Sequence, residues 1–276
     1  MGYLSSLSIT FDEPVNYFVD VLSYHYLLHT DQYTHEQALR ILNGDTSKLI
    51  EPINTLVDKL LQSSPDPHVI LFFDNGSCIQ NKVVYPMYKA NRQKSQLQTT
   101  VQRYTFCMLK EHFANANNVT VLDTSDFESD IVPYMCHVED WFDCKHVLNI
   151  IISRDKDFLQ MLEYNNWLQH TGSALYDKDT ALAYVNKRYK KGLSAGYLPV
   201  LLAIAGDNSD NIPGVPRYGV TRAYKYIVEY GLPQKLTYGS IKGPLSVHEP
   251  IIIRNYRLIS FEEQYKRCKK MKGGIL

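Results

Sequence analysis

The stretch that decides the fold is HVLNIIISRDKD, which runs from His146 to Asp157. Its isoleucine-rich apolar part is short and continuous, which is typical of a strand buried in a sheet. Two aspartates, Asp155 and Asp157, follow the apolar run directly. Because ligand sites in open parallel sheets lie just beyond the carboxyl ends of the strands, these acids are candidates for chemistry. The stretch therefore predicts a buried strand that ends in a functional loop.

Three more apolar runs precede this strand, and each predicts a further buried strand. They are VNYFVDVL at 15–22, HVILFF at 68–73 and NVTVL at 118–122. Amphipathic helical patterns occur at 35–42, 50–61 and 100–113. Alternating strands and helices predict an α/β fold whose mostly parallel central sheet is flanked by helices.

From residue 187 onward the pattern becomes helical, so we expect an α/β domain over 1–186 and a helical region over 187–276. The helical region contains GDNSDNIPGVPRYGVTRAYKYI, from Gly206 to Ile227. Its acids Asp207 and Asp210 are three residues apart, a spacing that directs both side chains to one face of a helical turn.

A helix break and a new helix start follow these two acids. The sequence Pro213-Gly214-Val215-Pro216 must end a helix. Gly219 then opens a second helix, whose first turn carries Thr221 and Arg222. The first turn of a helix has backbone N–H groups without intrahelical partners, and these can hold a phosphate. Acids beside a phosphate-binding turn indicate a metal ion between the two.

A basic and aromatic segment, YPMYKANR, runs from Tyr85 to Arg92. We expect it to be helical, so that Lys89 and Arg92 project from one side. Arginine offers a two-pronged fork to a phosphate, whereas lysine acts as a point charge. Tyr85 and Tyr88 are candidates for stacking on an unpaired base. The alternative is a surface helix with a tyrosine packed inward.

Acidic residues from five segments could meet at the carboxyl edge of the sheet. They are Asp20, Asp74, Glu128, Asp130, Asp155, Asp157, Asp207 and Asp210. Close together without cations, these groups would repel one another and several would take up protons. Hard divalent cations relieve this repulsion, and Mg²⁺ prefers a few carboxylates together with water and phosphate oxygens. Two ions about 4 Å apart can stabilise the attacking and leaving oxygens of a phosphodiester, which indicates metal-assisted hydrolysis.

Taken singly, each acid has a simpler interpretation. An aspartate directly after a strand is more often a helix cap or a turn residue than a metal ligand. Only the joint pattern favours a metal site.

Composition excludes several classes of protein. The 276 residues are 45% hydrophobic and 21% charged, which is ordinary for a globular chain, and the formal net charge is zero. Five cysteines without a paired framework indicate a reducing cytoplasm. We expect no membrane-spanning helix, because no apolar run reaches about 18 residues. Two cysteines and two histidines in Met135 to His146 do not have the spacing of a structural zinc site.

With these motifs in view, the chain resembles the 5′-nuclease or flap endonuclease family. It is most similar to phage-type members and to the 5′-nuclease domain of bacterial DNA polymerase I. Gly206 to Ala223 resembles the family's helix-hairpin-helix element, and Ile150 to Leu159 resembles the strand and paired aspartates of its metal site. Tyr88 to Arg92 resembles the start of the helical arch, which the resemblance places at about 80–113.

The resemblance implies a PIN-like nuclease fold and a role for each candidate residue. The eight acids would surround two Mg²⁺ ions, for which Mn²⁺ could substitute, and Lys89 and Arg92 would act in catalysis at the scissile phosphate. The residues implied in DNA binding are Lys82, Tyr88, Lys89, Arg92, Gly214, Val215, Arg217, Gly219, Thr221 and Arg222.

The resemblance also implies a substrate and a setting. It implies hydrolysis of phosphodiesters near the 5′ ends, flaps or junctions of DNA, with RNA–DNA hybrids as a further substrate left open. It implies a monomer in the cytoplasm of a bacterial or phage-infected cell, working in replication or repair, with replication proteins as further partners. Two alternatives stay open: a non-catalytic junction-binding protein with a decayed metal site, and a PIN-like ribonuclease.

The sequence departs from the family pattern at three places. The first motif keeps only Asp20 and Ser23 of an aspartate followed by Gly-Asn-Ser. The middle motif, usually Glu-Ala-Asp-Asp, is Glu128-Ser129-Asp130-Ile131 here and has lost one acid. In the hairpin, Arg217 and Tyr218 replace the first two residues of Gly-Ile-Gly, which we expect to strain the turn.

Overall fold

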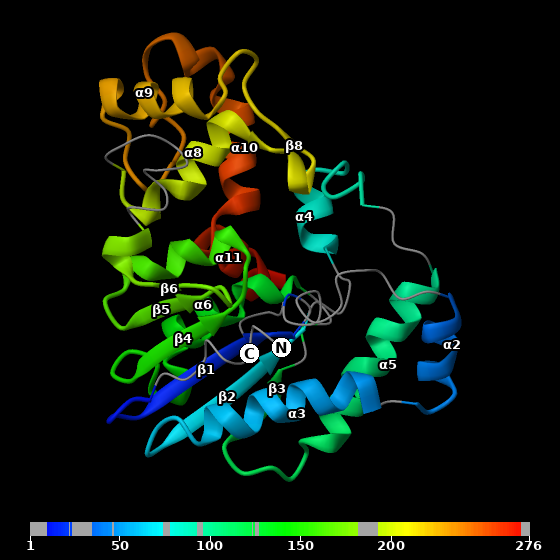
Figure 1. The fold of residues 1–276 in the computed structure, drawn as a ribbon. Helices are drawn as coiled ribbons and strands as arrows, with labels where there is room; N and C mark the ends of the chain where they lie inside the picture. The colour runs from blue at the N-terminus through cyan, green and yellow to red at the C-terminus, as the bar shows by residue number, and fades with distance from the viewer. Residues whose placement is uncertain are drawn as a thin grey trace. The chain divides into compact units, whose positions relative to one another are not determined.

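Six strands form the central sheet in the order β3-β2-β1-β4-β5-β6 (Figure 1). Their bounds are β1 Val15–Asp20, β2 Pro67–Phe72, β3 Val119–Leu122, β4 Leu148–Ile152, β5 Trp167–His170 and β6 Leu175–Tyr176. The pairs β1–β2, β1–β4, β2–β3 and β4–β5 are parallel. The structure, a computed structural model, describes residues 10–21, 23, 35–45, 47–73, 78–92, 96–122, 124, 127–181 and 193–271.

The described chain divides into two units, each with its own core. The sheet unit comprises Met1–Ser77, Lys94–Phe158 and Asn166–Leu175. The helical unit comprises Cys78–Gln93, Leu159–Asn165 and Tyr176–Leu276.

Strand register brings the carboxyl ends of neighbouring strands to one edge of the sheet. Asp20, the last residue of β1, pairs with Phe72 of β2, and Val19 pairs with Ile152 of β4. Because all three strands run in the same direction, the loops after Asp20, Phe72 and Ile152 leave the sheet at the same edge. This edge is where the sequence predicted the acidic site.

Helices cover both faces of the sheet, as parallel sheets require. On one face, α3 (Ser47–Leu61) and α5 (Gln96–His112) pack against alternate residues of β1, β2 and β4, with Leu56 and Leu109 fully buried. On the other face, the Phe18 ring lies 5.0 Å from that of Trp167. The Trp167 indole N–H donates a hydrogen bond to His137 of α6 (Val132–Glu139) over 3.2 Å. Helix α2 (His35–Leu42) contacts α5 through Ile41 and Val101.

The helical unit is organised around α8 and α10. Its elements are α4 Ile79–Val84, η3 Lys156–Glu163 in part, η4 Ala195–Tyr197, α8 Leu198–Ala205, β7 Gly206–Asp207, η5 Asn208–Asp210, β8 Ile212–Pro213, α9 Val220–Tyr230, η6 Gly243–His248, α10 Glu249–Ile259 and α11 Phe261–Met271. Asn255 of α10 is fully buried, and its amide donates to the carbonyls of Ala203 (2.9 Å) and Pro213 (2.8 Å). The Asn255 side chain thus joins α10 by hydrogen bonds both to α8 and to the hairpin that follows α8.

The last helix, α11, holds α4 in place. Arg267 donates to the side-chain oxygen of Asn81, and the Cys268 thiol donates to Gln80 over 2.9 Å. Burial lowers the pKa of Arg267. Although α4 and α11 are nearly 190 residues apart in sequence, polar contacts between buried and half-buried groups join them.

Most expected elements are present, with shifts of at most four residues at their ends. The four predicted strands appear as β1 to β4, and the predicted helices appear as α2, α3 and α5. The sequence did not predict β5, whose four residues include Gln169 and His170. The predicted division between 186 and 187 lies outside the described residues and stays a prediction.

Candidate functional site

Asp20 and Ser153 link the ends of β1 and β4. The Asp20 carboxylate is 8% exposed and accepts hydrogen bonds from the Ser153 hydroxyl at 2.8 Å and from the Ser23 amide at 3.1 Å. The Ser23 hydroxyl in turn accepts from the Arg154 amide at 3.0 Å. These bonds fix the orientation of Asp20 at the sheet edge, and they use the serine that the first motif retains.

The loop after β4 is held by its own hydrogen bonds. Ser153 Oγ accepts from the Asp155 amide at 3.1 Å, and Asp155 Oδ1 accepts from the Asp157 amide at 3.0 Å. The Gln169 amide donates to the carbonyls of Ser153 (3.0 Å) and Asp155 (2.7 Å). Lys156 Nζ lies 3.5 Å from the Asp157 carboxylate. Asp155, Lys156 and Asp157 therefore form a hydrogen-bonded loop, and Ser153 links this loop to Asp20.

Glu128 and Asp130 lie at the predicted helix start. Glu128 is 5% exposed and occupies the N-cap position of η1 (Ser129–Ile131), which leads into α6. Asp130 is half-buried within η1.

The described acids of the sheet unit do not form a preassembled set of metal ligands. Among the described residues, the only three His, Cys, Asp or Glu side chains with ligand atoms within 4.8 Å of one another are Asp140, Asp143 and His146. They belong to an exposed turn in which His146 pairs with Asp143 over 2.7 Å, and this hydrogen bond raises the pKa of His146. Asp74, predicted as a ligand, lies outside the described residues.

In the helical unit, Asp207 caps the turn that contains Asp210. Asp207 is the N-cap of η5, and its carboxylate accepts from the amide (3.0 Å) and the hydroxyl (2.6 Å) of Ser209. Both Asp207 and Asp210 are buried.

Asp210 is surrounded by the segment that carries the predicted catalytic cations. It accepts a hydrogen bond from the Tyr88 hydroxyl at 2.8 Å, forms an ion pair with Arg92, and lies 3.8 Å from Lys89 Nζ. The Asp210 side chain is 12% exposed, that of Lys89 11% and that of Arg92 44%. Of the two cations, Arg92 is therefore the more accessible to a ligand.

Backbone groups strengthen this junction. The Lys89 amide donates to the Asp210 carbonyl at 2.9 Å, and Arg92 Nε donates to the Ser209 carbonyl at 3.2 Å. Asn91 and Asn211 add one bond each, to the carbonyls of Asn208 (3.0 Å) and Met87 (2.6 Å) respectively. Sequence reasoning missed this network, which we call the Asp210 clamp, because its two halves are about 120 residues apart.

Two expectations for the Tyr85–Arg92 segment were wrong. The segment is not helical: α4 ends at Val84, and turns follow in which Lys89 adopts a left-handed φ of 53°. Pro86 lacks the N–H that a continuing helix needs. Tyr88 is 1% exposed, so its ring is not available for stacking on a base, and the inward-packed alternative is correct for this residue.

The hairpin between α8 and α9 is tightly packed. A Cβ at Gly214 would lie 2.2 Å from the Ala205 carbonyl oxygen, so only glycine fits there. Val215 donates its amide to the Ile204 carbonyl at 2.8 Å. Arg217 adopts a φ of 69°, as expected for a residue that replaces glycine in a strained turn.

The start of α9 agrees with the prediction. Gly219 is the N-cap of the helix, and Thr221 and Arg222 are exposed in its first turn. Lys82, on α4, is also exposed.

Comparison with known proteins defines the class. Residues 17–190 match the 5′-3′ exonuclease family, N-terminal resolvase-like domain. The chain therefore belongs to this family, which confirms both the resemblance and the prediction of an enzyme of the nuclease class.

Particular relatives include bacterial DNA polymerase I. The chain is 28% identical over 211 residues to that of Caldicellulosiruptor bescii and 26% identical over 223 residues to that of Mycobacterium leprae. These alignments cover 76% and 78% of this chain but only 24% of each polymerase, so the chain spans about a quarter of their length.

Solved structures confirm the fold class. T5 5′-exonuclease with bound divalent metal ions (zinc) has a TM-score of 0.63 at 19% identity, covering 92% of this chain and 91% of that one. The bacteriophage T5 D15 flap endonuclease in complex with DNA and metal ions has a TM-score of 0.61 at 18% identity, covering 94% and 98%. Within the described parts of the chain, no helix is long and apolar enough to cross a membrane.

Proposed function

We propose that this protein is a metal-dependent, structure-specific 5′-nuclease that hydrolyses phosphodiesters near the 5′ ends, flaps or junctions of DNA. The observation that carries the proposal is the hydrogen-bonded row of Asp20, Ser153 and Asp155 at the carboxyl edge of the sheet. In a chain of the 5′-3′ exonuclease family, this edge is the natural place for the reaction.

The carboxylates at this edge suit divalent ions. Asp20 and Glu128 are buried acids of the sheet unit, and carboxylate oxygens are the ligands that hard divalent cations prefer. Among the described residues, no three acids at this edge have ligand atoms within 4.8 Å of one another, but Mg²⁺ retains several waters and is held through few carboxylates. We assign the ions to Asp20, Asp155 and Asp157, with Asp74, Glu128 and Asp130 around them, and to Asp207 and Asp210 in the helical unit. When bound, such ions polarise the phosphodiester and lower the pKa of water.

Lys89 and Arg92 are proposed to contact the reacting phosphate and to offset its developing charge. Both cations already neutralise Asp210, so a phosphate would have to share them with this carboxylate. Arg92 has the more exposed side chain and several donors, and it can bind a phosphate while it keeps one bond to Asp210. Tyr88 acts in this scheme by positioning Asp210, and not by contact with DNA.

Duplex DNA is proposed to bind at the hairpin and the start of α9. Gly214, Val215 and Gly219 shape the backbone there, and Arg217, Thr221 and Arg222 supply side chains for phosphates. Lys82 on α4 would add a further contact to the DNA backbone. Such contacts position a duplex without reading its sequence.

The relatives suggest the wider setting. DNA polymerase I and a flap endonuclease bound to DNA and metal ions are among the similar proteins. We propose Mg²⁺ as the principal ion with Mn²⁺ as a substitute, and a monomer acting on branched or 5′-ended DNA in replication or repair. RNA–DNA hybrids and replication proteins are proposed as further substrates and partners.

The test is cleavage of a 5′-labelled flap duplex with Mg²⁺ or Mn²⁺, with EDTA as the metal-free arm. Asp155→Asn/Asp157→Asn should abolish product while binding of the flap is retained. Asp66→Asn is the matched control, because Asp66 is an exposed aspartate that precedes β2 at the opposite edge of the sheet. It should cleave like the parent protein.

Product that persists in EDTA or in the double variant would contradict the proposal. Tight flap binding without product in either metal would instead establish the non-catalytic binding protein. Product lengths would divide exonuclease from flap endonuclease action, and an RNA flap in the same assay would test the ribonuclease alternative.

A further inference from the structure

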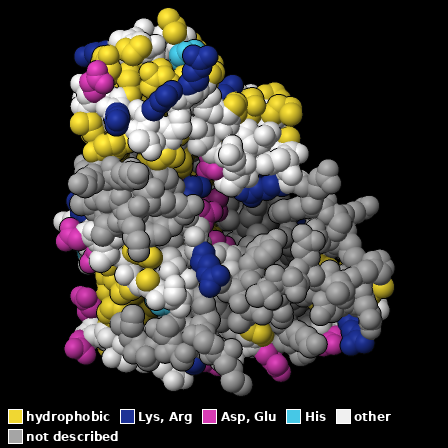
Figure 2. All heavy atoms as spheres, turned by 45° about the horizontal axis from the view of Figure 1, so that its top comes forward, with side chains coloured by type: hydrophobic (Ala, Val, Ile, Leu, Met, Phe, Trp, Pro, Cys, Tyr) yellow, Lys and Arg dark blue, Asp and Glu magenta, His cyan; other side chains and the backbone are white. Residues whose placement is uncertain are grey.

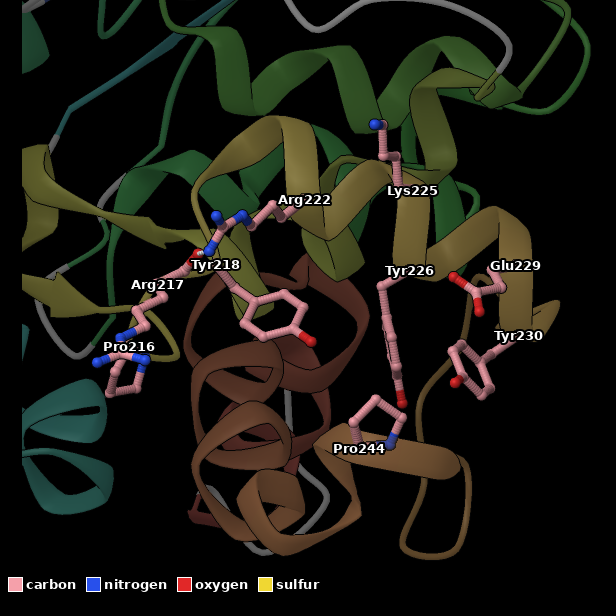
Figure 3. Close-up of a pocket in the computed structure, with 9 residues that line it drawn as sticks. All are labelled: Pro216, Arg217, Tyr218, Arg222, Lys225, Tyr226, Glu229, Tyr230 and Pro244. Carbon is pink, nitrogen blue, oxygen red and sulfur yellow. Dashed lines mark hydrogen bonds between the residues drawn. The ribbon is translucent and has the colours of Figure 1, made fainter.

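A groove of about 400 Å³ lies along α9, on the surface of the helical unit (Figure 3). Pro216 of the hairpin and Pro244 of η6 are among its lining residues, and the remaining side chains come from the hairpin and α9. In Figure 2, Lys and Arg side chains lie among side chains of the hydrophobic class, which includes tyrosine, on this unit. The groove extends beyond the hairpin residues assigned above to the duplex.

Three cations line the groove: Arg217, Arg222 and Lys225. All three are exposed, and Arg222 Nη1 donates to the Arg217 carbonyl at 2.9 Å, which holds the two arginines together. Glu229 is the one acid among the lining residues, so the groove carries a net positive charge. This charge suits an anion with room for hydrogen bonds, such as a phosphate.

Three tyrosines form the other wall of the groove. Tyr226 is 3% exposed and donates its hydroxyl to the Lys242 carbonyl; its ring lies 4.6 Å from that of Tyr230 and 6.2 Å from that of Tyr218. Burial raises the pKa of Tyr226 to about 12, so this phenol stays neutral. Tyr218 and Tyr230 are half-buried and therefore present part of their rings to a ligand.

Close packing against the η6 backbone restricts the Tyr230 side chain of this wall. Gly243 has a φ of 65°, and a Cβ there would lie 2.4 Å from the Tyr230 ring. The η6 backbone thus packs directly on Tyr230. A rigid aromatic surface loses little conformational entropy when a ligand stacks on it.

From this arrangement we propose that the groove binds one unpaired nucleotide of a nucleic acid strand. Arg222 and Lys225 take the phosphate, and the base stacks on Tyr218 or Tyr230, because an unpaired base exposes its faces to aromatic side chains. Glu229 accepts a hydrogen bond from the base or the sugar. The proposal deepens the proposed function, and rests on it only in that the protein acts on nucleic acid.

The test is equilibrium binding of the full chain, in EDTA, to a fluorescent oligothymidylate and to a blunt hairpin duplex. Tyr218→Leu and Tyr230→Leu keep apolar bulk and remove the aromatic face. At least one of the two should weaken oligothymidylate binding about 5-fold or more, the effect of losing one base stack. Lys225→Gln, an exposed change that spares the fold, should make the slope of log affinity against log salt shallower by about 0.7.

Two controls come from the same unit. Tyr224 is also half-buried on α9 and packs against the same core, but it does not line the groove, so Tyr224→Leu should bind oligothymidylate within about 2-fold of the parent. Lys242→Gln removes an exposed charge outside the groove and should leave the salt slope unchanged.

Equal losses for blunt duplex and oligothymidylate, an equal loss in Tyr224→Leu, or unchanged binding in all groove variants would each overturn the proposal. Because no cleavage is measured, the result is separable from the nuclease assay. If the protein cleaves flaps but the groove variants bind oligothymidylate like the parent, only the proposal of a nucleotide-binding groove is wrong. If the groove variants lose oligothymidylate binding but the protein cleaves no flap, only the proposed nuclease function is wrong.

Discussion

The Asp210 carboxylate interacts with three side chains of the short segment Tyr88 to Arg92. It accepts a hydrogen bond from the Tyr88 hydroxyl and forms ion pairs with Lys89 and Arg92. An aspartate that is to bind a metal is commonly oriented by hydrogen bonds from neighbouring groups, and Tyr88 is placed to do this. The same clamp keeps Lys89 and Arg92 beside a negative charge, with which the phosphate of the proposed substrate would have to compete. Asp210 therefore connects the residues that we assign to metal binding with those that we assign to the phosphate.

Tyr88→Phe tests the clamp, because it removes only the hydroxyl that bonds Asp210. We expect the free energy of unfolding to fall by about 1.5–3 kcal/mol, the range for a hydrogen bond to a charged group. Urea denaturation measures this change. Tyr85→Phe is the control, since Tyr85 meets Arg254 through its ring, which phenylalanine retains. Equal stability of the two variants would show that the Tyr88 hydroxyl contributes nothing.

His137 gives the sheet unit a predictable response to acid. Burial lowers the pKa of His137 below its usual 6.5, and Trp167 donates a hydrogen bond to its ring nitrogen. Because the folded pKa lies below the unfolded one, the neutral form is favoured by folding. This stabilisation is present above about pH 6.5 and is lost as the pH falls through the folded pKa.

We therefore expect urea midpoints to fall between about pH 7.5 and about pH 5.5, and to fall less in His137→Asn. Asparagine keeps an acceptor for Trp167 but cannot titrate. Burial also lowers the pKa of His68, so part of the dependence should persist in the single variant. A variant with the full dependence of the parent would exclude His137 as its source.

At the scale of elements, the hairpin depends on the close approach of two backbone segments. Gly214 lies so near the end of α8 that a Cβ would overlap the Ala205 carbonyl group. At Gly219, by contrast, a Cβ would meet nothing within 4 Å. These two glycines form a matched pair within one motif.

We expect Gly214→Ala to lower the free energy of unfolding by about 2–3 kcal/mol, because the backbone must shift to admit the methyl group. Gly219→Ala should cost at most about 1 kcal/mol, the effect of exchanging a favoured N-cap residue for alanine. Thermal and urea denaturation compare the two. The reverse order of stability would show that the packing at Gly214 is not what holds the hairpin.

Strand prediction succeeded where apolar runs were continuous, even in the four residues of β3, and failed at β5, where polar residues interrupt the run. The isoleucines of β4 and the run in β1 are buried on both faces, which gives a strong signal in the sequence. In β5, Gln169 and His170 are buried polar residues; Gln169 serves the loop of Asp155 by hydrogen bonding, a role that no periodic pattern encodes. The acids of the sheet edge could be predicted because strand ends share an edge. The Asp210 clamp could not, because it is a long-range contact between two turns.

At the scale of the whole molecule, positive and negative charges balance, with 29 of each and a formal net charge of zero. Long-range attraction of DNA by net charge is therefore absent, and affinity should reside in local contacts. The salt dependence of binding then counts the phosphates that individual cations neutralise.

Arg222→Gln should reduce the slope of log affinity against log salt for a blunt hairpin duplex by about 0.9, the value for one phosphate contact. Arg257→Gln, which removes an exposed arginine on α10, should leave the slope unchanged. Fluorescence anisotropy titrations over a range of salt concentrations measure both. An unchanged slope in Arg222→Gln would remove this residue from the duplex contact.

The way in which α4 is held has a consequence for dissecting the protein into fragments. Residues Cys78–Gln93 belong to the helical unit, although the chain on either side of them belongs to the sheet unit. A fragment cut at residue 187 would lack Gln80 and Asn81, and Cys268 and Arg267 of α11 would lose these partners. Such a truncation would uncover the Arg267 guanidinium and leave it only the carbonyls of Arg257 and Glu263 as partners within the C-terminal helices. Independent expression of the C-terminal part would therefore require the α4 segment to be grafted back, either by circular permutation or as a peptide supplied in trans.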